Sequence, residues 1–574
     1  MKAINDVNSL GSRDGFALLL TMIVVVVMVA LISGAVMVGG NHQLAERYYE
    51  RGSVLDAVAK SGLELARARI NGNASLYPDS GYATLENGVT VKDGAGATIP
   101  GIKRWTYVGP TGLTAGQYGI FGSIVTVVRD DGGGEVVRRT EIFQESFARF
   151  VYFTDVEGSI YFNGDSFWGP VHSNDQLKLS GYPSFFHNDV TTAKTVKTPS
   201  LGTFDQGYEE NVSVIPLPST TEIAKLQGYA AIGGTSFTGD SNGNDSEATT
   251  RIEFVAVDLN GDTDTTDDDE GFFKVYKSSN VVWLSGYYDG DVRDNGNCGR
   301  WYSGTFVPMA DHPYAGISAQ TASLKGDAIC YLGGDARITN GFVANDGKGS
   351  WLPWTGTVAP GLAGRPDAGY LFPLARRYNP NFKGVIAVSG KVGVSGTVRG
   401  RVTVVATDDI IILDDLQYTT PPAVGTCQDM VGLFAGDDVM VAHSLMNAAQ
   451  RPYSTQAWHT YDDTGDEFID SVILALDQFG AAEPSAGAAV NENCLADPGG
   501  RGCLFVTGGI IQRARGAVGN GAYGYWKKYS WDACALSAPP PYFPTTEQFR
   551  KGRQFDVDPT GFSVANYFAS LTPS

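Results

Sequence analysis

A strongly acidic stretch, VDLNGDTDTTDDDEGFF, carries oxygen-bearing side chains at a spacing that suits a cation. Counted from Asp258, an amide or a carboxylate occurs at the third, fifth, seventh and twelfth positions, as in a calcium-binding loop. The sixth position holds Thr263 instead of glycine, and a solvated acidic loop is the alternative interpretation. The spacing predicts a Ca²⁺ site with the ligands Asp258, Asn260, Asp262, Asp264 and Asp269.

All six cysteines follow the long apolar segment near the N-terminus. Export of this part of the chain would favour disulfides. Cys494 and Cys503 flank a short LADPGGRG loop and are predicted to form one, whereas spacing alone does not select a pairing for the others. Zinc binding is disfavoured, because there is no CxxC motif and no paired spacing of histidines. The other cysteines are Cys298, Cys330, Cys427 and Cys534.

Aspartates at the ends of short apolar runs are the candidates for acid–base chemistry. If the runs stack as adjacent coils, two carboxylates could act as acid and base on a polysaccharide. Aspartates are also ordinary turn residues, and the sequence has no nucleophile elbow, phosphate-binding loop or dinucleotide fingerprint. We therefore expect a protein without enzymatic activity, with a surface-anchored β-helix enzyme as the alternative. The aspartates are Asp408, Asp409, Asp414, Asp415, Asp437 and Asp438.

Aromatic side chains are concentrated in two short regions. Packing in the interior is the default expectation for them. If they are exposed on a β surface, planar rings can stack on sugars or fill a pocket, so that a surface glycan or another cell-surface ligand would be a partner. The residues are Trp351, Trp354, Tyr370, Tyr378, Trp526, Tyr529, Trp531, Tyr542 and Phe543.

Composition restricts the partners and the fold class. The chain has 62 acidic and 42 basic residues and a net charge of −20, which argues against nucleic acid as a partner. It contains 72 glycines and only 18% charged residues, which indicates a mainly β protein that is rich in turns.

Short apolar runs separated by Gly, Asn and Asp are typical of residues 151–520. Residues 384–413, GVIAVSGKVGVSGTVRGRVTVVATDDIIIL, show the pattern most clearly, and 431–443 and 503–512 repeat it. Strands this short must bury their faces on neighbouring coils. We predict a large β-helix or β-solenoid body, interrupted by an acidic insertion at about 195–320, with a short-strand β-sandwich as the alternative. An aromatic and proline-rich segment follows at 521–574.

Residues 72–150 are expected to form a small β head. GIFGSIVTVV and EVVRRTEIFQESF flank a turn around Asp130–Gly134, as the two strands of a hairpin do. This sheet is expected to pack on the helix that precedes it.

The segment from Phe16 to Val38 contains no charged residue. As a helix it would be about 35 Å long, enough to cross a hydrocarbon core of roughly 30 Å. The helical pattern continues as an amphipathic stripe that includes Leu44, Tyr48 and Leu55, and Asn71-Gly72-Asn73 ends it. One helix over 16–71, half in the membrane and half amphipathic, is predicted.

Residues 1–70 resemble the N-terminus of a type IV prepilin. The polar leader, residues 1–15, ends at Gly15, where a leader peptidase would cut, and Phe16 would begin the mature chain. Major pilins carry glutamate at the fifth mature position, which is Leu20 here, so the resemblance is to PilX-type minor pilins and tip pseudopilins.

The resemblance implies a single-pass protein of the inner membrane with a cytoplasmic N-terminus and an exported body, which is also incorporated into a surface pilus. Its partners would be other pilin or pseudopilin subunits, and its role pilus assembly, tip display or adhesion. A static envelope scaffold is a further alternative.

Phrases in the body resemble a family of exported bacterial proteins of unknown function that often follow prepilin-like helices. The phrases are GPVHSN, GGIIQRARGAVG, GYWKKYSWD and PPPYFP. The family implies no activity, so no catalytic residue is carried over. His172 in GPVHSN is expected to be a hydrogen-bonded histidine at a turn.

Overall fold

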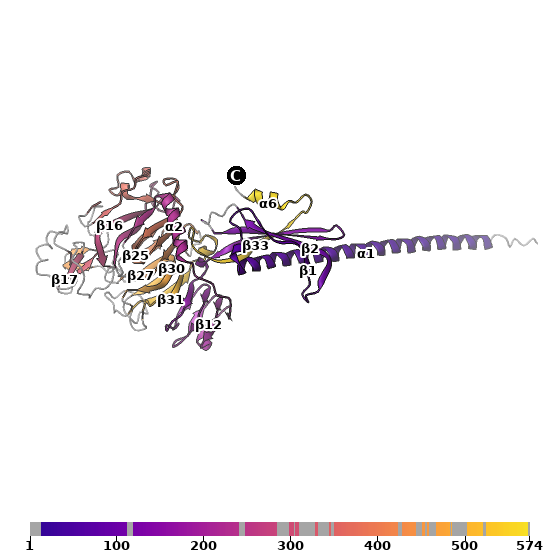
Figure 1. Ribbon diagram of the computed structural model, residues 1–574, viewed down its shortest axis with the longest axis horizontal. Helices are drawn as coiled ribbons and strands as arrows, with labels where there is room; N and C mark the ends of the chain where they lie inside the picture. Colours follow the sequence, from indigo (N-terminus) through magenta and orange to yellow (C-terminus); the bar gives the residue numbers. More distant parts are fainter. Residues whose placement is uncertain are drawn as a thin grey trace, which may run out of the picture. The chain divides into compact units, whose positions relative to one another are not determined.

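The computed structural model describes two compact units (Figure 1). Unit 1 comprises the described residues of Met1–Leu113, Phe121–Phe143 and Phe549–Ser574, and unit 2 comprises those of Thr114–Ile120 and Gln144–Gln548. The described residues are 13–111, 117, 119–239, 247–283, 298–302, 305–308, 328–330, 344–345, 349–422, 427–442, 450–453, 456–458, 466–482, 484, 502–519 and 524–571.

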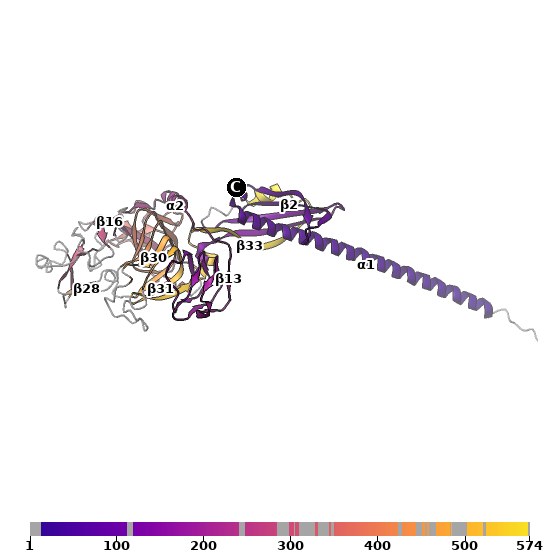
Figure 2. The same ribbon diagram turned by 60° about the horizontal axis from the view of Figure 1, so that its bottom comes forward.

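Helix α1 (Arg13–Gly72) is continuous, which confirms the predicted long helix (Figure 2). Its first half is apolar on every side, and its most apolar window has a mean hydropathy of 3.0 and is 0% buried. By length and composition this helix can cross a membrane. Asn73 ends it and caps the short 3₁₀ helix Ala74–Leu76 with its side chain.

The second half of α1 packs on a sheet. Leu55, Val58 and Ala59 are buried in one cluster with apolar residues of the strands. Leu44 and Tyr48, which continue the same stripe towards the N-terminus, are exposed. The buried apolar face therefore begins at Leu55, and before it Arg51 forms an ion pair with Asp130 of the sheet.

Unit 1 is completed by a five-stranded sheet in the order β1-β2-β3-β4-β33. The predicted hairpin is confirmed, since β3 and β4 pair antiparallel on either side of the Asp130–Gly134 turn. The fifth strand comes from the C-terminal segment, and α6 (Val564–Leu571) adds Phe568 to a cluster on the side of Val127. The strands are β1 (Ala83–Lys92), β2 (Thr98–Pro110), β3 (Phe121–Asp130), β4 (Glu135–Ser146) and β33 (Thr545–Val557).

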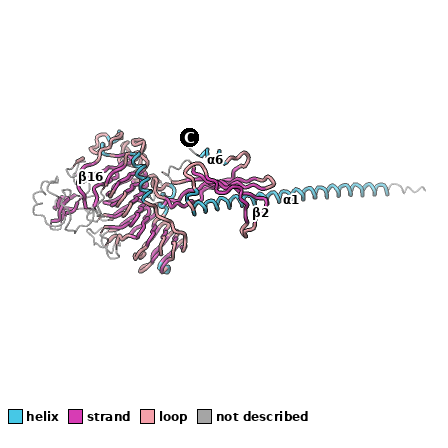
Figure 3. The backbone as a smooth tube through the Cα atoms, in the orientation of Figure 1, coloured by secondary structure: helices cyan, strands magenta, loops and turns pink. Residues whose placement is uncertain are grey.

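Unit 2 contains a continuous stack of parallel strands, which Figure 3 shows as a row of magenta segments. The pairing joins each strand to its neighbour in the stack. In order these are β13 (Tyr208–Glu210), β10 (Val190–Thr192), β7 (Val171–Ser173), β5 (Tyr152–Val156), β31 (Cys503–Arg515), β30 (Glu467–Ala481), β26 (Met430–Ala435), β24 (Arg401–Ala406), β22 (Val385–Ser389) and β14 (Ser236–Thr238).

The order of the stack differs from the order of the sequence. The chain enters in the middle at β5 and builds β7, β10 and β13 towards one end. It resumes at the other end with β14 and returns strand by strand to β31, which pairs with β5. Two stretches that are far apart in the sequence therefore make one stack.

Both faces of this stack are buried. One face contributes a column to the main hydrophobic core. The other face lies under α2 (Thr220–Gly233) and the segment around Cys534, including Phe543. A disulfide joins Cys427 to Cys534 with a Cα–Cα distance of 5.2 Å. The buried column consists of Ile386, Val404, Leu433, Ile473, Ile510, Tyr152, Val171 and Val190.

Two further arrays of strands enclose the same core. The first is parallel except for β16, which pairs antiparallel with β15. Its strands are β15 (Glu247–Ala256), β16 (Gly271–Trp283), β23 (Val392–Val398), β25 (Ile410–Tyr418) and β27 (Val439–Val441). The second array is parallel and joins β30 and β31 to β32 (Trp526–Trp531), β6 (Ser166–Phe167), β9 (Ser184–Phe186) and β12 (Gly202–Phe204).

The remaining elements are short. Strands β8 (Leu177–Lys178) and β11 (Val196–Lys197) pair with each other, and β20 (Gly349–Trp351) and β21 (Phe372–Pro373) pair with β16. The others are β17 (Cys298–Tyr302), β18 (Thr305–Pro308), β19 (Ala328–Cys330), β28 (Gln450–Tyr453), β29 (Gln456–Trp458), α5 (Cys534–Ser537) and the 3₁₀ helices Phe147–Arg149, Pro199–Leu201, Pro360–Leu362 and Ala368–Tyr370.

The contact between α1 and its sheet yields a first prediction. A Cβ atom at Gly62 would lie 2.7 Å from Cδ of Arg104 and 2.8 Å from Cγ2 of Thr126, whereas a Cβ at Gly52 would meet no atom within 4 Å. We expect Gly62→Leu to destabilise unit 1 by about 2 kcal/mol, because overpacking outweighs the gain in helix propensity. Because unit 1 is less stable in this variant, the hydrogen-exchange rates of the backbone amides in β2 and β3 should rise.

Gly52→Leu is the matched control on the same helix. It should leave exchange unchanged or slow it slightly, since leucine favours the helix by up to about 1 kcal/mol. Equal exchange in both variants would contradict the described packing.

Candidate metal centre

The acidic loop connects β15 to β16, two antiparallel strands that hold its ends together. The Asp258 carboxylate accepts hydrogen bonds from the backbone N–H of Gly261 at 2.6 Å and of Thr263 at 3.0 Å. These donors, Gly261 first, hold the pKa of Asp258 below its usual range. Thr263 has a φ of 78°, so it makes the left-handed turn that glycine usually makes at the sixth position.

The predicted ligands Asp258 and Asp262 come together with Glu270. One oxygen from each of these residues lies within 4.8 Å of the other two, which is close enough to hold one metal ion. Glu270 is fully buried, and its carboxylate accepts hydrogen bonds from the N–H of Leu259 at 2.8 Å and of Asp267 at 3.0 Å. An all-oxygen set of this kind suits a hard divalent cation.

The other predicted ligands make contacts within the loop or beyond it. Asn260 donates from its amide nitrogen to Asp262 at 3.0 Å and to Asp267 at 2.8 Å. Asp264 accepts from the N–H of Thr266 at 2.9 Å. Asp269 faces away from the cluster and forms an ion pair with Arg377 at 2.8 Å.

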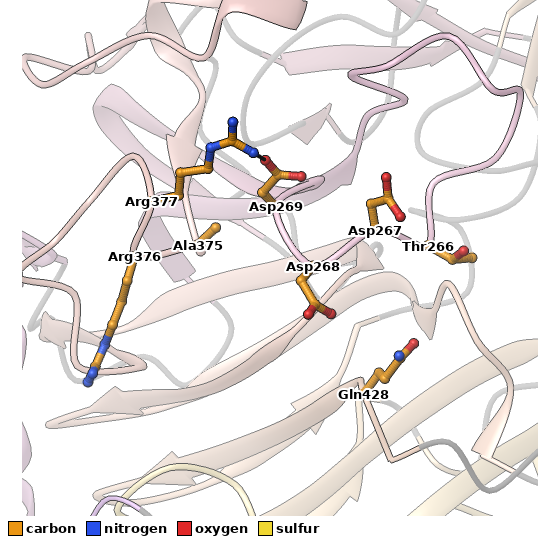
Figure 4. A pocket seen from close by; sticks show the side chains of 8 residues that line it. All are labelled: Thr266, Asp267, Asp268, Asp269, Ala375, Arg376, Arg377 and Gln428. Carbon is orange, nitrogen blue, oxygen red and sulfur yellow. Dashed lines mark hydrogen bonds and ion pairs between the residues drawn. The ribbon is translucent and has the colours of Figure 1, made fainter.

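An open cleft of about 610 Å³ lies beside the loop (Figure 4). Arg377 reaches across its rim to Asp269, while Asp268 points to the side where Gln428 lies. Below the loop, the buried Arg399 donates to the carbonyl of Asp267 at 2.9 Å and pairs with Asp268 and Asp429, both at 3.1 Å. Arg399 therefore attaches the loop to residues that flank the parallel strands β23, β24 and β26.

Sequence reasoning missed Glu270 as a candidate ligand. The twelve-position count ends at Asp269, so the next residue was left out. The available signal was its position: Glu270 directly precedes β16, so it lies at the base of the loop, next to the start of the loop at Asp258.

Of the aspartates considered for acid–base chemistry, Asp408, Asp409, Asp437 and Asp438 lie between strands, whereas Asp414 and Asp415 lie within β25. Asp409 accepts from the N–H of Asp438 at 3.0 Å and pairs with the buried Lys391 at 3.3 Å. Asp438 accepts from the N–H of Gln478 at 2.9 Å. Burial raises the pKa of Asp409 to about 7 and that of Asp438 to about 6. Asp409 and Asp438 connect the turns that follow neighbouring strands, and with Asp408, Asp437 and Asp477 they form two further groups close enough to hold a metal ion.

The remaining predicted residues are placed as follows. Phe16 lies in α1 and is 68% exposed, and Gly15 precedes it in the same helix. Cys503 is buried and disulfide-bonded, whereas Cys494, the partner predicted for it, lies outside the described residues. His172 is buried and hydrogen-bonded to Thr191 at 2.7 Å and to Asn174 at 2.9 Å, as predicted, but it lies in strand β7 and not at a turn.

Comparisons with known proteins give little guidance. No protein-family model matches the sequence, and no curated protein matches it. Among solved structures, the chain is similar to the competence-associated pilin ComZ from Thermus thermophilus. The alignment has 8% identity and a TM-score of 0.26, and it covers 83% of this chain and 86% of that one. A score this low supports no conclusion about fold or function.

The Asp409–Asp438–Gln478 contacts predict a dependence of stability on pH. The folded state raises the pKa of Asp438 from 3.8 to about 6, so it binds a proton more tightly than the unfolded chain does. The stability that protonated Asp438 contributes is complete below about pH 4 and is lost as the pH rises through 6.

Asp438→Asn keeps an acceptor for Gln478 and removes the buried charge. It should raise the free energy of unfolding at pH 8 by about 2–3 kcal/mol and flatten its pH dependence between 4 and 7. Asp79→Asn, at an exposed position, is the control and should change neither. Denaturant titrations across this pH range measure the effect, and an unchanged slope in Asp438→Asn would contradict it.

Proposed function

We propose that this protein is a membrane-anchored subunit of the minor-pilin kind that acts in the assembly or tip display of a type IV pilus or pseudopilus. The observation that carries the proposal is α1, a single helix with two different surfaces. Its first half is apolar and exposed on all sides, and its second half is buried on an antiparallel sheet. This is the construction expected of a subunit that is first held in a membrane and then packed among other helices.

The mechanism is physical. In the inner membrane the surface of Phe16–Val38 is covered by lipid. On assembly the same surface would be covered by the apolar helices of other pilin or pseudopilin subunits, and the body would be carried outside. Leu20, where major pilins carry glutamate, favours a minor or tip position over the repeating position in the fibre.

We infer that unit 2 is a β-solenoid that this anchor displays. Ten strands in a continuous parallel stack support this architecture, and they disfavour the β-sandwich alternative, which is built from antiparallel strands. The absence of an enzymatic role remains a prediction. For the alternative polysaccharide enzyme, the favoured location would be the Asp408–Asp438 region, but those carboxylates are already bonded to backbone and to Lys391.

We propose Ca²⁺ as the cation of the Asp258–Asp262–Glu270 cluster. Mg²⁺ requires near-ideal octahedral geometry, whereas Ca²⁺ accepts irregular sets of carboxylate and carbonyl oxygens in a flexible loop. The ion would reduce repulsion among the loop carboxylates and fix the loop between β15 and β16.

Leader processing tests the pilin-like function. The leader should be removed between Gly15 and Phe16, because a polar leader ends there at the edge of the apolar segment. Mass spectrometry of the native protein should find Phe16 at the N-terminus, and Gly15→Val should retain the leader. A native chain that still begins at Met1, in a host with active prepilin peptidase, would contradict the proposal and favour the static scaffold.

Thermal unfolding of the full chain tests calcium. Millimolar Ca²⁺ should stabilise the protein relative to chelator by about 2.7 kcal/mol at a hundredfold excess over Kd. Asp258→Ala combined with Asp262→Ala should remove most of this difference. Mg²⁺ at the same concentration should have a smaller effect.

Two single variants separate the two ligand sets. Glu270→Gln should weaken the response if the cluster seen in the structure binds the ion, and Asp264→Ala should weaken it if the twelve-position pattern applies. A wild-type midpoint that does not respond to Ca²⁺, together with no binding by direct titration, would show that the loop is a solvated turn.

A further inference from the structure

Trp168 is an exposed tryptophan whose ring is held in place from one side. Its side chain is 59% exposed. The imidazole of His187 stacks on the indole with a centroid distance of 3.7 Å and an interplanar angle of 21°. His187 is in turn held by Asp205, with 2.7 Å between Nδ1 and Oδ2. The ring is therefore oriented in advance, although most of it is in contact with solvent.

This tryptophan stands in a row that crosses several parallel strands. Trp168 pairs with Ser530 of β32, and the register of β6, β9 and β12 places His187 and Asp205 at the following positions. Buried residues such as Phe167 and Phe186 alternate with this row along the strands, so the row points outward. In spatial order it consists of Asp470, Thr507, Ser530, Trp168, His187 and Asp205.

A second outward row lies two residues earlier on the same strands. Phe468 and Phe505 stack with parallel rings, 4.7 Å apart, and Phe468 and Phe185 are 37% and 41% exposed. Lys528 and Ser166 lie between Phe505 and Phe185 in the register. Planar rings and polar side chains therefore follow each other along the direction in which the strands stack.

The position beside Trp168 is occupied by a short side chain. Ser530 lies on the side of the indole away from His187, and its hydroxyl bonds to that of Thr507 at 3.2 Å. Because Ser530 and Thr507 are small, the indole face of Trp168 that lies on their side has no neighbouring ring in its row. They also offer hydrogen-bonding groups at its base.

Charge indicates what kind of ligand fits. Asp205 is paired with His187, and Lys528 lies in the neighbouring row as a counter-charge to the carboxylates. Within these two rows the charges nearly cancel, whereas the whole chain carries −20. An anionic polymer would be repelled by the chain as a whole, and a polycation would prefer its acidic loops.

We propose that this face binds an extended neutral polysaccharide, with one pyranose ring stacked on the open face of Trp168. The C–H-rich face of an equatorially linked pyranose is apolar and flat, so it gains by covering an indole. Its rim hydroxyls need hydrogen-bond partners, which Ser530 and Thr507 supply on the open side of the indole. Further rings of the chain would extend over Phe185 on one side and Phe505 on the other.

The proposal does not depend on the pilin-like function. It concerns residues of unit 2, and binding is measured on the purified full chain. Failure of leader processing would leave it intact, and absence of glycan binding would leave the anchoring mechanism intact.

Isothermal titration calorimetry is the test, with the full chain in a detergent that has no sugar headgroup. Cellohexaose and chitohexaose are the neutral probes and hexagalacturonate is the anionic one. At least one neutral probe should bind, and Trp168→Ala should lower the affinity for that probe about tenfold or more. Trp168→Phe should retain part of the affinity, and His187→Ala should give an intermediate loss because the indole is no longer held.

The control variant Tyr49→Ala lacks another exposed aromatic side chain, which lies in unit 1. It should bind the neutral probe as tightly as the wild type does. An unchanged melting temperature in Trp168→Ala would show that the fold is intact. The proposal is overturned if neither neutral probe binds, if Trp168→Ala binds as well as the wild type, or if hexagalacturonate binds more tightly. It is also overturned if Trp168 instead mediates self-association that the variant abolishes.

Discussion

The proposed role of α1 depends on one interaction, the burial of its second half on the sheet of unit 1. From Leu55 onward the helix has one covered face, and Gly62 lets it approach Arg104 and Thr126 closely. Because the helix is continuous, fixing this half also fixes the direction in which the apolar half leaves the sheet. The exposed apolar surface of Phe16–Val38 then needs another cover, which a membrane or neighbouring helices can provide.

Unit 2 meets a different constraint. Many of its strands, such as β7, β10 and β14, have only three residues and are too short to be stable as separate hairpins, so they are stabilised by pairing with the neighbouring strands of the stack. One surface of the stack faces the main hydrophobic core, and a second surface is covered by α2 and the Cys534 segment. The outer side of the array that contains β6, β9 and β12 has no such cover among the described residues, and there the outward side chains are free to meet a ligand.

The sequence predicts those features whose signal is local. The long helix and the β3–β4 hairpin follow from periodicity and turn residues, and the structure confirms both. The mainly β composition is confirmed as well. Asp258 and Asp262 are brought together as their spacing suggests, because the loop that holds them is short.

The features that were not predicted depend on contacts between distant residues. Nothing near β33 indicates that it joins a sheet made by residues 83–146, since pairing of strands so far apart has no signal in one sequence. The same holds for the junction of β5 with β31 and for the Cys427–Cys534 disulfide. Trp168 is not among the aromatic residues that the sequence analysis singles out, and only the register with His187 and Ser530 gives it neighbours.

Site-specific photo-crosslinking from the apolar half of α1 tests the central claim most directly. A photoreactive residue at Leu31, which is 68% exposed, would be activated in intact cells, with the same residue at the exposed Gly133 turn as control. We predict adducts between Leu31 and the apolar helix of another pilin-class subunit, formed only while pilus assembly is active. Adducts with lipid alone, unchanged when assembly is switched on, would contradict the account.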